Sequence, residues 1–226
     1  PALLETVLTE AAALIDDVDL HLTHLALRVT ISVIGAADAT GAPIAGVAKS
    51  VVLPKALTLA ASPLLQGLAL SSLLELFGAL CGCAAAGLDF ATLYGALLEM
   101  VSGALAKQAV ANLARALATL CAQADEPTRA QSVAGFVADI RGAPDETRRR
   151  LALLCVGELG RERDLQSVAS LQTIILESFE SGEEETKTAA ACVVDARARP
   201  RARRSRSHSH LWHSRRYALG LVAVGN

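Results

Sequence analysis

Apolar positions recur at helical spacing in blocks, and short groups of glycine, proline and acidic residues separate these blocks. The pattern predicts ten helices in five antiparallel pairs, over residues 2–15, 19–35, 44–60, 63–82, 88–102, 105–123, 128–141, 144–159, 164–180 and, with an interruption, 183–224. We expect a break at Gly41-Ala42-Pro43 and a loop at Asp125-Glu126-Pro127. Ser62 and Pro63 are predicted to supply an N-cap and a first helical residue.

The helix predicted over residues 144–159 has a distinctive local pattern. Pro144 suits the first helical position, and Asp145 and Glu146 lie in the first turn, where the helix dipole favours carboxylates. The segment from Leu151 to Val156 is apolar on every side. We therefore expect this helix to be buried on more than one face and to end near Gly160.

A motif in this helix recurs further along the chain. The first copy reads Arg149-x-x-Ala152-x-x-Cys155-Val156-Gly157, and the second starts as Lys187-x-x-Ala190 and resumes at Ala218-Leu219-Gly220 when residues 192–216 are left out. The two motif glycines are then 38 residues apart instead of 63. Helical-pair repeats of the HEAT/armadillo type have a period of about 40–47 residues, so the sequence predicts an all-α solenoid of five helix pairs.

Composition and charge divide the chain into parts. Hydrophobic residues make up 52% of the 226 residues and aromatic residues only 3%, and the abundant alanine and leucine favour helices over strands. The formal net charge is −2, but residues 192–216 contain eight arginines and one aspartate, so the remainder is acidic. An acidic body suits a basic protein partner and argues against nucleic-acid binding there. We divide the chain into a solenoid over 1–191, an Arg/Ser/His-rich insertion over 192–216, and the end of the last repeat helix over 217–226.

The insertion over 192–216 has several interpretations. Its arginines and Pro200 do not fit the buried face of a repeat helix, so we expect it to loop out or to be a gene-model artefact. The alternative is an RNA-binding or nuclear-targeting arm over 197–216. Three histidines in it would then add metal affinity: His208, His210 and His213.

The sequence predicts no catalytic residues, no cofactor site and no metal site. It contains neither a phosphate-binding glycine loop nor a nucleophile elbow. Cys81 and Cys83 lack zinc-site spacing and nearby histidines, so we expect buried thiols. His21 and His24 lie three apart on one helix but lack a third ligand. These observations predict a protein that is not an enzyme.

Two other stretches bear on function. Polar side chains on the helix over 105–123 are predicted to line a polar edge, with a binding ridge as the alternative; they are Lys107, Gln108, Asn112 and Arg115. The apolar stretch from Leu64 to Ala86 is long enough to cross a bilayer, but Glu75 and other polar residues interrupt it. We expect this stretch to be a core helix of the solenoid.

Several motifs, taken in order, resemble one known family. They are Ser62-Pro63-Leu64-Leu65-Gln66-Gly67, Leu151-Ala152-Leu153-Leu154 followed by Gly157-Glu158-Leu159-Gly160, Asp164-Leu165, Ile175-Leu176-Glu177-Ser178-Phe179, Glu184-Glu185 with Lys187, Tyr217-Ala218-Leu219-Gly220 and Val224-Gly225-Asn226. In this order and spacing they are similar to the cullin-associated and neddylation-dissociated family. The resemblance covers the chain from about Ser62, extends more weakly to Pro1, and breaks only at 192–216.

The resemblance implies a function. Members of the family look like long HEAT-repeat solenoids that wrap around an unneddylated cullin–RING scaffold and promote exchange of adaptor and substrate-receptor modules, without chemistry of their own. The resemblance also implies that this chain is a piece of a longer protein, from the region leading into the C-terminal third. The expected location of that protein is the cytoplasm and the nucleus. No motif defines the cullin-contact residues, so the partner-binding residues stay unknown. On repeat pattern alone, the alternative is another α-solenoid such as a nuclear transport receptor or a phosphatase scaffold.

Overall fold

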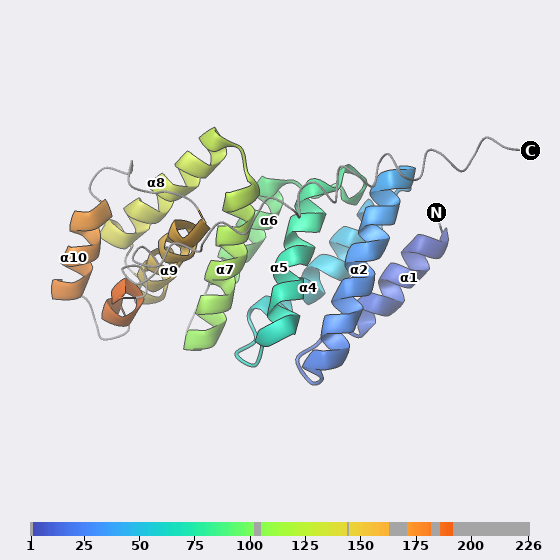
Figure 1. Ribbon diagram of the computed structural model, residues 1–226, viewed down its shortest axis with the longest axis horizontal. Helices are drawn as coiled ribbons and strands as arrows, with labels where there is room; N and C mark the ends of the chain where they lie inside the picture. Colours follow the sequence, from blue (N-terminus) through green and yellow to red (C-terminus); the bar gives the residue numbers. More distant parts are fainter. Residues whose placement is uncertain (1, 102–104, 144, 163–170, 182–185, 192–226) are drawn as a thin grey trace, which may run out of the picture.

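The computed structural model describes residues 2–101, 105–143, 145–162, 171–181 and 186–191. All regular secondary structure in these ranges is helical, which confirms the predicted all-α fold (Figure 1). The elements are α1 (Ala2–Ala13), α2 (Leu20–Thr40), α3 (Ala45–Val47), the π-helical η1 (Ala48–Val52), α4 (Leu53–Ala60), α5 (Gly67–Gly82), the 3₁₀ turn η2 (Ala84–Ala86), α6 (Phe90–Glu99), α7 (Lys107–Gln123), α8 (Glu126–Gly142), α9 (Glu146–Glu162) and α10 (Leu171–Ser181). Residues 186–191 are also helical.

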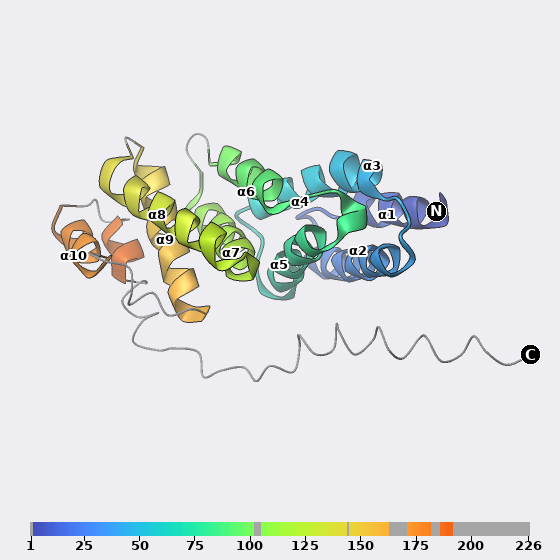
Figure 2. The same cartoon turned by 90° about the horizontal axis from the view of Figure 1, so that it is seen from above.

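The helices stack in two layers (Figure 2). In one layer α2, α5, α7 and α9 follow one another, and each contacts the next. The other layer contains α1, the α3–η1–α4 segment, α6 and α8, and its helices pack on the first layer, as α1 does on α2 and α8 on α9. Contacts between successive repeats join Ala114 to Cys155, 41 residues apart, and Ile34 to Cys83, 49 residues apart. The first separation lies within the period of about 40–47 residues, and the second lies slightly above it.

The hydrophobic core runs along the stack between the two layers. Leucines of α5 and α7 are completely enclosed, among them Leu73, Leu76, Leu113 and Leu117. Each such side chain contributes about 1.5–3 kcal/mol by leaving water. The segment from Leu151 to Val156 in α9 is buried except for the half-buried Leu154, which confirms that this helix packs on several faces.

The helix predicted over 44–60 forms, but it changes its winding. Residues 48–52 adopt a π turn between α3 and α4, and Pro54 follows at the start of α4. Proline has no N–H, and its ring clashes with the carbonyl four residues earlier in an α-helix, here that of Ser50. We attribute the wider π turn to relief of that clash, which lets the segment continue without a break.

Aspartate side chains cap three helices at their N-termini. Asp19 caps α2, Asp89 caps α6 and Asp125 caps α8, each by accepting hydrogen bonds from backbone amides of the first turn. Such a cap stabilises a helix by about 1 kcal/mol. The predicted loop at residues 125–127 is therefore wrong, because α8 already begins at Glu126 and Pro127 occupies its first turn, where the missing N–H is not needed.

Other predicted boundaries also need correction. The helix predicted from Pro63 begins at Gly67, because Ser62 stabilises a turn instead of capping a helix. The helix expected to end near Gly35 continues to Thr40, and Gly41 ends it in a left-handed conformation, with φ 67°. Gly160 does not end α9, which continues to Glu162.

Some predictions fall on residues outside the described ranges. These concern Pro144, residues 164–170, Glu183–Glu185 and the whole of 192–226, including the three histidines of the insertion. The predicted division at 191/192 and 216/217 therefore stays a prediction.

One described helix, α2, is long and apolar enough to cross a membrane by length and composition alone. Its Arg28 pairs with Glu75 of α5, and its Leu27 and Ile34 are enclosed by neighbouring helices. These contacts are those of a core helix. The apolar stretch from Leu64 to Ala86, which is long enough in sequence to cross a bilayer, begins with a turn and continues as the shorter core helix α5.

Candidate partner-binding face

Charged side chains bridge successive helices of the α2–α5–α7–α9 layer. The guanidinium of Arg28 on α2 pairs with the Glu75 carboxylate on α5. Further along, Nε of Arg115 on α7 lies 3.4 Å from Oε1 of Glu158 on α9. The same oxygen accepts a hydrogen bond from Nη1 of Arg161 at 2.8 Å. The first two pairs join residues from adjacent repeats, whereas Glu158 and Arg161 lie on the same helix, and all of them are on partly exposed parts of the stack.

The exposure of these ion pairs determines how much they contribute to the stability of the fold. The side chains of Arg28 and Glu75 are 52% and 56% exposed. Exposed ion pairs contribute only about 0–1 kcal/mol to stability, because water and salt screen them. Their charges stay available to a partner that carries opposite charges. The arrangement can therefore bind a charged protein surface, and it positions no pair of groups for chemistry.

Two buried polar side chains fix the turns that connect the layers. The Thr23 hydroxyl, which is fully buried, donates to the backbone carbonyl of Asp16 at 2.7 Å in the α1–α2 turn. Nδ2 of Asn112, whose side chain is also buried, donates to the carbonyls of Ser62 at 3.1 Å and Leu65 at 3.2 Å in the α4–α5 turn. Each turn thus has a defined shape, which is set from inside the stack.

The structure separates the polar residues that the sequence grouped on α7. Asn112 points inward to the α4–α5 turn, and Gln108 supports it by donating from Nε2 to Oδ1 of Asn112 at 3.0 Å. Arg115 bridges to α9, and Lys107 is exposed at the start of the helix. Sequence periodicity did not reveal the inward role of Asn112, because its carbonyl partners lie 47 and 50 residues earlier.

The cysteines in the described residues are thiols in apolar surroundings. Burial raises the pKa of Cys121 to about 11, and burial raises the pKa of Cys155 well above its ordinary range. Burial, followed by the nearby charge of Asp89, raises the pKa of Cys81, and burial also raises the pKa of Cys83. A protonated thiol is a poor nucleophile and a poor metal ligand. These side chains therefore act as packing groups.

The two histidines noted in the sequence do not act together. Nδ1 of His24 lies 2.8 Å from the Ser72 hydroxyl oxygen on α5, whereas His21 is exposed one turn earlier. Among the described residues, no three His, Cys, Asp or Glu side chains are grouped so that they could hold a metal ion. His24 instead adds a polar contact between the α2 and α5 helices.

Comparison with known proteins identifies relatives along nearly the whole chain. A cullin-associated NEDD8-dissociated protein 1 from Arabidopsis thaliana is 34% identical over 98% of the chain. Proteins of the same name from Dictyostelium discoideum and Drosophila melanogaster are 30% and 32% identical, each over 86% of the chain. This chain belongs to the cullin-associated NEDD8-dissociated family. It spans 16% of the length of each of these relatives. No protein-family model matches the chain.

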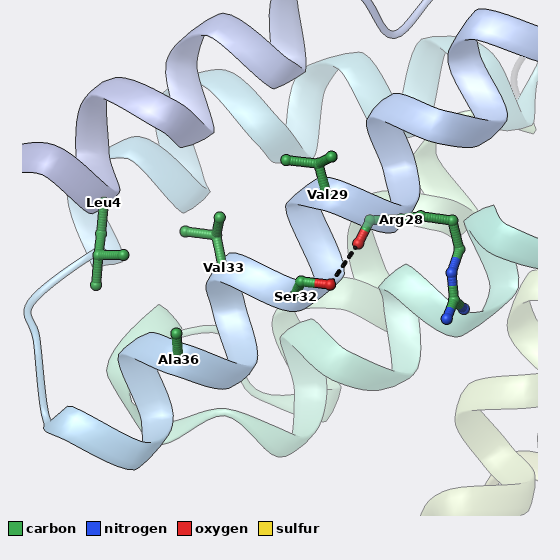
Figure 3. A pocket seen from close by; sticks show the side chains of 6 residues that line it. All are labelled: Leu4, Arg28, Val29, Ser32, Val33 and Ala36. Carbon is green, nitrogen blue, oxygen red and sulfur yellow. Dashed lines mark hydrogen bonds between the residues drawn. The ribbon is translucent and has the colours of Figure 1, made fainter.

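In this family member a shallow pocket of about 330 Å³ lies on α1 and α2 (Figure 3). Its lining is mostly aliphatic and consists of Leu4, Arg28, Val29, Ser32, Val33 and Ala36. The Ser32 hydroxyl donates to the backbone carbonyl of Arg28, and the Arg28 guanidinium turns away toward Glu75. The polar side chains of the pocket lining, Arg28 and Ser32, are therefore both engaged in contacts of their own.

The register of the repeats explains this pocket. α2 begins at Leu20 and α5 begins at Gly67, and this shift of 47 residues relates Val29 on α2 to Leu76 on α5 and Val33 to Leu80. Leu76 and Leu80 are fully buried, whereas Val29 is 45% exposed and Val33 is 9% exposed. The pocket thus lies on the α2 face that corresponds to the covered, stacking face of α5. We interpret it as a helix-stacking surface and not as a ligand site.

Proposed function

We propose that this chain is part of a non-enzymatic scaffold that binds an unneddylated cullin–RING complex and promotes exchange of its adaptor and substrate-receptor modules. The observation that carries the proposal is the similarity to three cullin-associated NEDD8-dissociated proteins over 86–98% of the chain. The helical stack, with charges exposed between its repeats, is compatible with such a role.

The proposed exchange needs no covalent step. A solenoid contacts a partner through many sites of modest strength, and strain is shared among its repeats. When the scaffold and an adaptor bind overlapping or mutually strained sites on one cullin, each weakens the binding of the other by the same factor. Release of one module and entry of another then follow from this coupling.

Charge supports the choice of a basic partner surface. Outside 192–216 the chain is acidic, and carboxylates such as Glu75 are half exposed. Complementary charge accelerates encounter and fixes the orientation of two proteins. Since charges on the surface are screened over about 8 Å at physiological ionic strength, we expect the affinity for a cullin to fall as salt concentration rises.

The test uses the complete protein that contains this segment. Calorimetry should show binding to the bare cullin–RING complex and much weaker binding to the NEDD8-modified complex. A fluorescently labelled adaptor on the cullin should dissociate faster when the protein is added. A variant of the complete protein without these repeats should bind the bare complex more weakly.

Two results would contradict the proposal. One is equal affinity for bare and NEDD8-modified cullin, and the other is unchanged binding after removal of these repeats.

We also propose a cytoplasmic and nuclear location for the complete protein. Imaging of a fluorescent fusion tests it, and restriction to any other compartment would contradict it.

A further inference from the structure

Two consecutive turns at one edge of the stack expose large aliphatic side chains. Val18, in the α1–α2 turn, is 88% exposed, and Leu64 and Leu68, in and after the α4–α5 turn, are 58% and 66% exposed. We refer to these three residues as the turn patch. The two turns touch, because the Ser62 hydroxyl donates to Oδ2 of Asp17 at 2.7 Å.

The turn patch does not serve the packing of the repeats. None of its three residues is among the buried or partly buried side chains of the hydrophobic core, whereas Leu65, within the same turn, is fully buried. The patch lies where the chain passes from one layer to the other, and the layers themselves meet through other residues. Stacking and core formation therefore leave the exposure of Leu64 and Leu68 unexplained.

The backbone under the turn patch is held in a fixed shape. Thr23 ties the α1–α2 turn from inside the stack, and Asn112 ties the α4–α5 turn in the same way. Oδ1 of Asp16 also accepts a hydrogen bond from the Val18 amide at 3.0 Å. Leu64 is restrained likewise, since its amide donates to the Ser62 hydroxyl oxygen at 3.1 Å. A surface that is already ordered loses little conformational entropy on binding.

The border of the turn patch is acidic. Asp16, Asp17 and Asp19 surround Val18 in the sequence, and residues 14–19 and 61–68 contain no lysine or arginine. A partner that buries these aliphatic side chains must bring apolar groups of its own, and it gains from cations at their border.

We infer that the turn patch is a contact surface for the cullin, and that the cullin surface it meets is apolar with lysine or arginine at its border. This inference rests on the proposed function, to which it adds the residues that make the contact and the chemistry of the cullin surface that they meet. Burial of two leucines accounts for a tenfold or larger effect on affinity.

The experiment compares variants of the complete protein in binding to the bare cullin–RING complex. The double variant Leu64→Ser/Leu68→Ser should raise Kd at least about tenfold. Leu176→Ser removes a leucine that is 55% exposed on α10, far along the stack, and should leave Kd unchanged (Figure 1). A second pair of variants, Leu68→Lys and Leu68→Glu, tests the charge of the partner surface. If that surface is cationic, the introduced lysine is repelled, so Leu68→Lys should weaken binding more than Leu68→Glu.

Each outcome has a defined meaning. Circular dichroism and thermal melting should first show that the exposed substitutions leave the fold intact. If the wild type binds and the double serine variant binds equally well, the inference is wrong and the proposed function stands. Equal effects of Leu68→Lys and Leu68→Glu would overturn the cationic border. If the wild type fails to bind the bare cullin complex, the proposed function is wrong and the inference with it.

Discussion

Replacing Asn112 by alanine should destabilise the stack far more than an ordinary change of a polar residue. Nδ2 of Asn112 supplies hydrogen bonds to the carbonyls of Ser62 and Leu65, at 3.1 and 3.2 Å, from a side chain that is 1% exposed. A buried carbonyl that loses its donor costs about 1–3 kcal/mol. Two carbonyls at a turn, where water can partly replace the donor, should together cost about 2–4 kcal/mol.

Thermal and urea unfolding of the chain measure this cost. At about 2–4 °C per kcal/mol for a protein of this size, Tm should fall by roughly 4–16 °C. Hydrogen exchange should also accelerate at the Leu64 amide, which the Ser62 hydroxyl now protects. Asn112→Asp keeps the volume but replaces the donor with a carboxylate that faces two carbonyls, so it should destabilise at least as much.

Gln108→Ala is the matched control for this prediction. It lies on the same helix and removes an exposed side chain whose hydrogen bond is to Asn112 alone. Its cost should stay below about 1 kcal/mol, because Gln108 is exposed and water can replace its donor at Oδ1 of Asn112. If Asn112→Ala costs less than about 0.5 kcal/mol, or no more than the control, then the turn holds its shape without the asparagine and the predicted role of Asn112 is wrong.

Three further predictions follow from other parts of the chain. Burial raises the pKa of Cys121 to about 11 from 9.0, so the contribution of its thiol to stability is complete below about pH 9 and is lost as pH rises toward 11. In urea melts across this range, the free energy of unfolding should fall less for Cys121→Ser than for the wild type. An equal fall would contradict the assignment. Gly87→Ala should cost about 1–2 kcal/mol, because φ is 63° and the new Cβ would lie 3.1 Å from Ala45 Cβ, whereas Gly46→Ala, with open space around it, should be neutral or stabilising in the same melts. Deletion of residues 192–216 should leave Tm equal or higher and remove protease cleavage sites; a lower Tm would show that the insertion is an integral part of the fold.

Much of the fold follows from local features of the sequence. The apolar period of 3.6 residues and the breaker groups predicted the helices of both layers, because helix formation depends on neighbours within a few positions. The apolar segment from Leu151 to Val156 predicted burial on several faces, since no side of that helix can face water. The spacing of the repeated motif predicted the solenoid and its period.

Helix boundaries depended on contacts between residues that are distant in the sequence. Ser62 followed by Pro63 is typical of a helix start, yet the Ser62 hydroxyl binds Asp17 of the preceding turn and α5 begins later. The π turn before Pro54 was not predicted from the apolar period, because it is one wider turn inside a segment that stays helical on both sides.

The roles of the polar residues were decided by tertiary structure alone. Asn112 and Arg115 lie three residues apart on one helix, so the sequence placed them on one polar edge. In the stack Asn112 reaches carbonyls of the preceding repeat, whereas Arg115 reaches Glu158 of the following repeat. A sequence fixes the period of a helix and the face that is apolar, because these are local properties. The partner of a polar side chain lies 40 to 50 residues away, and only the register of the packed repeats selects it.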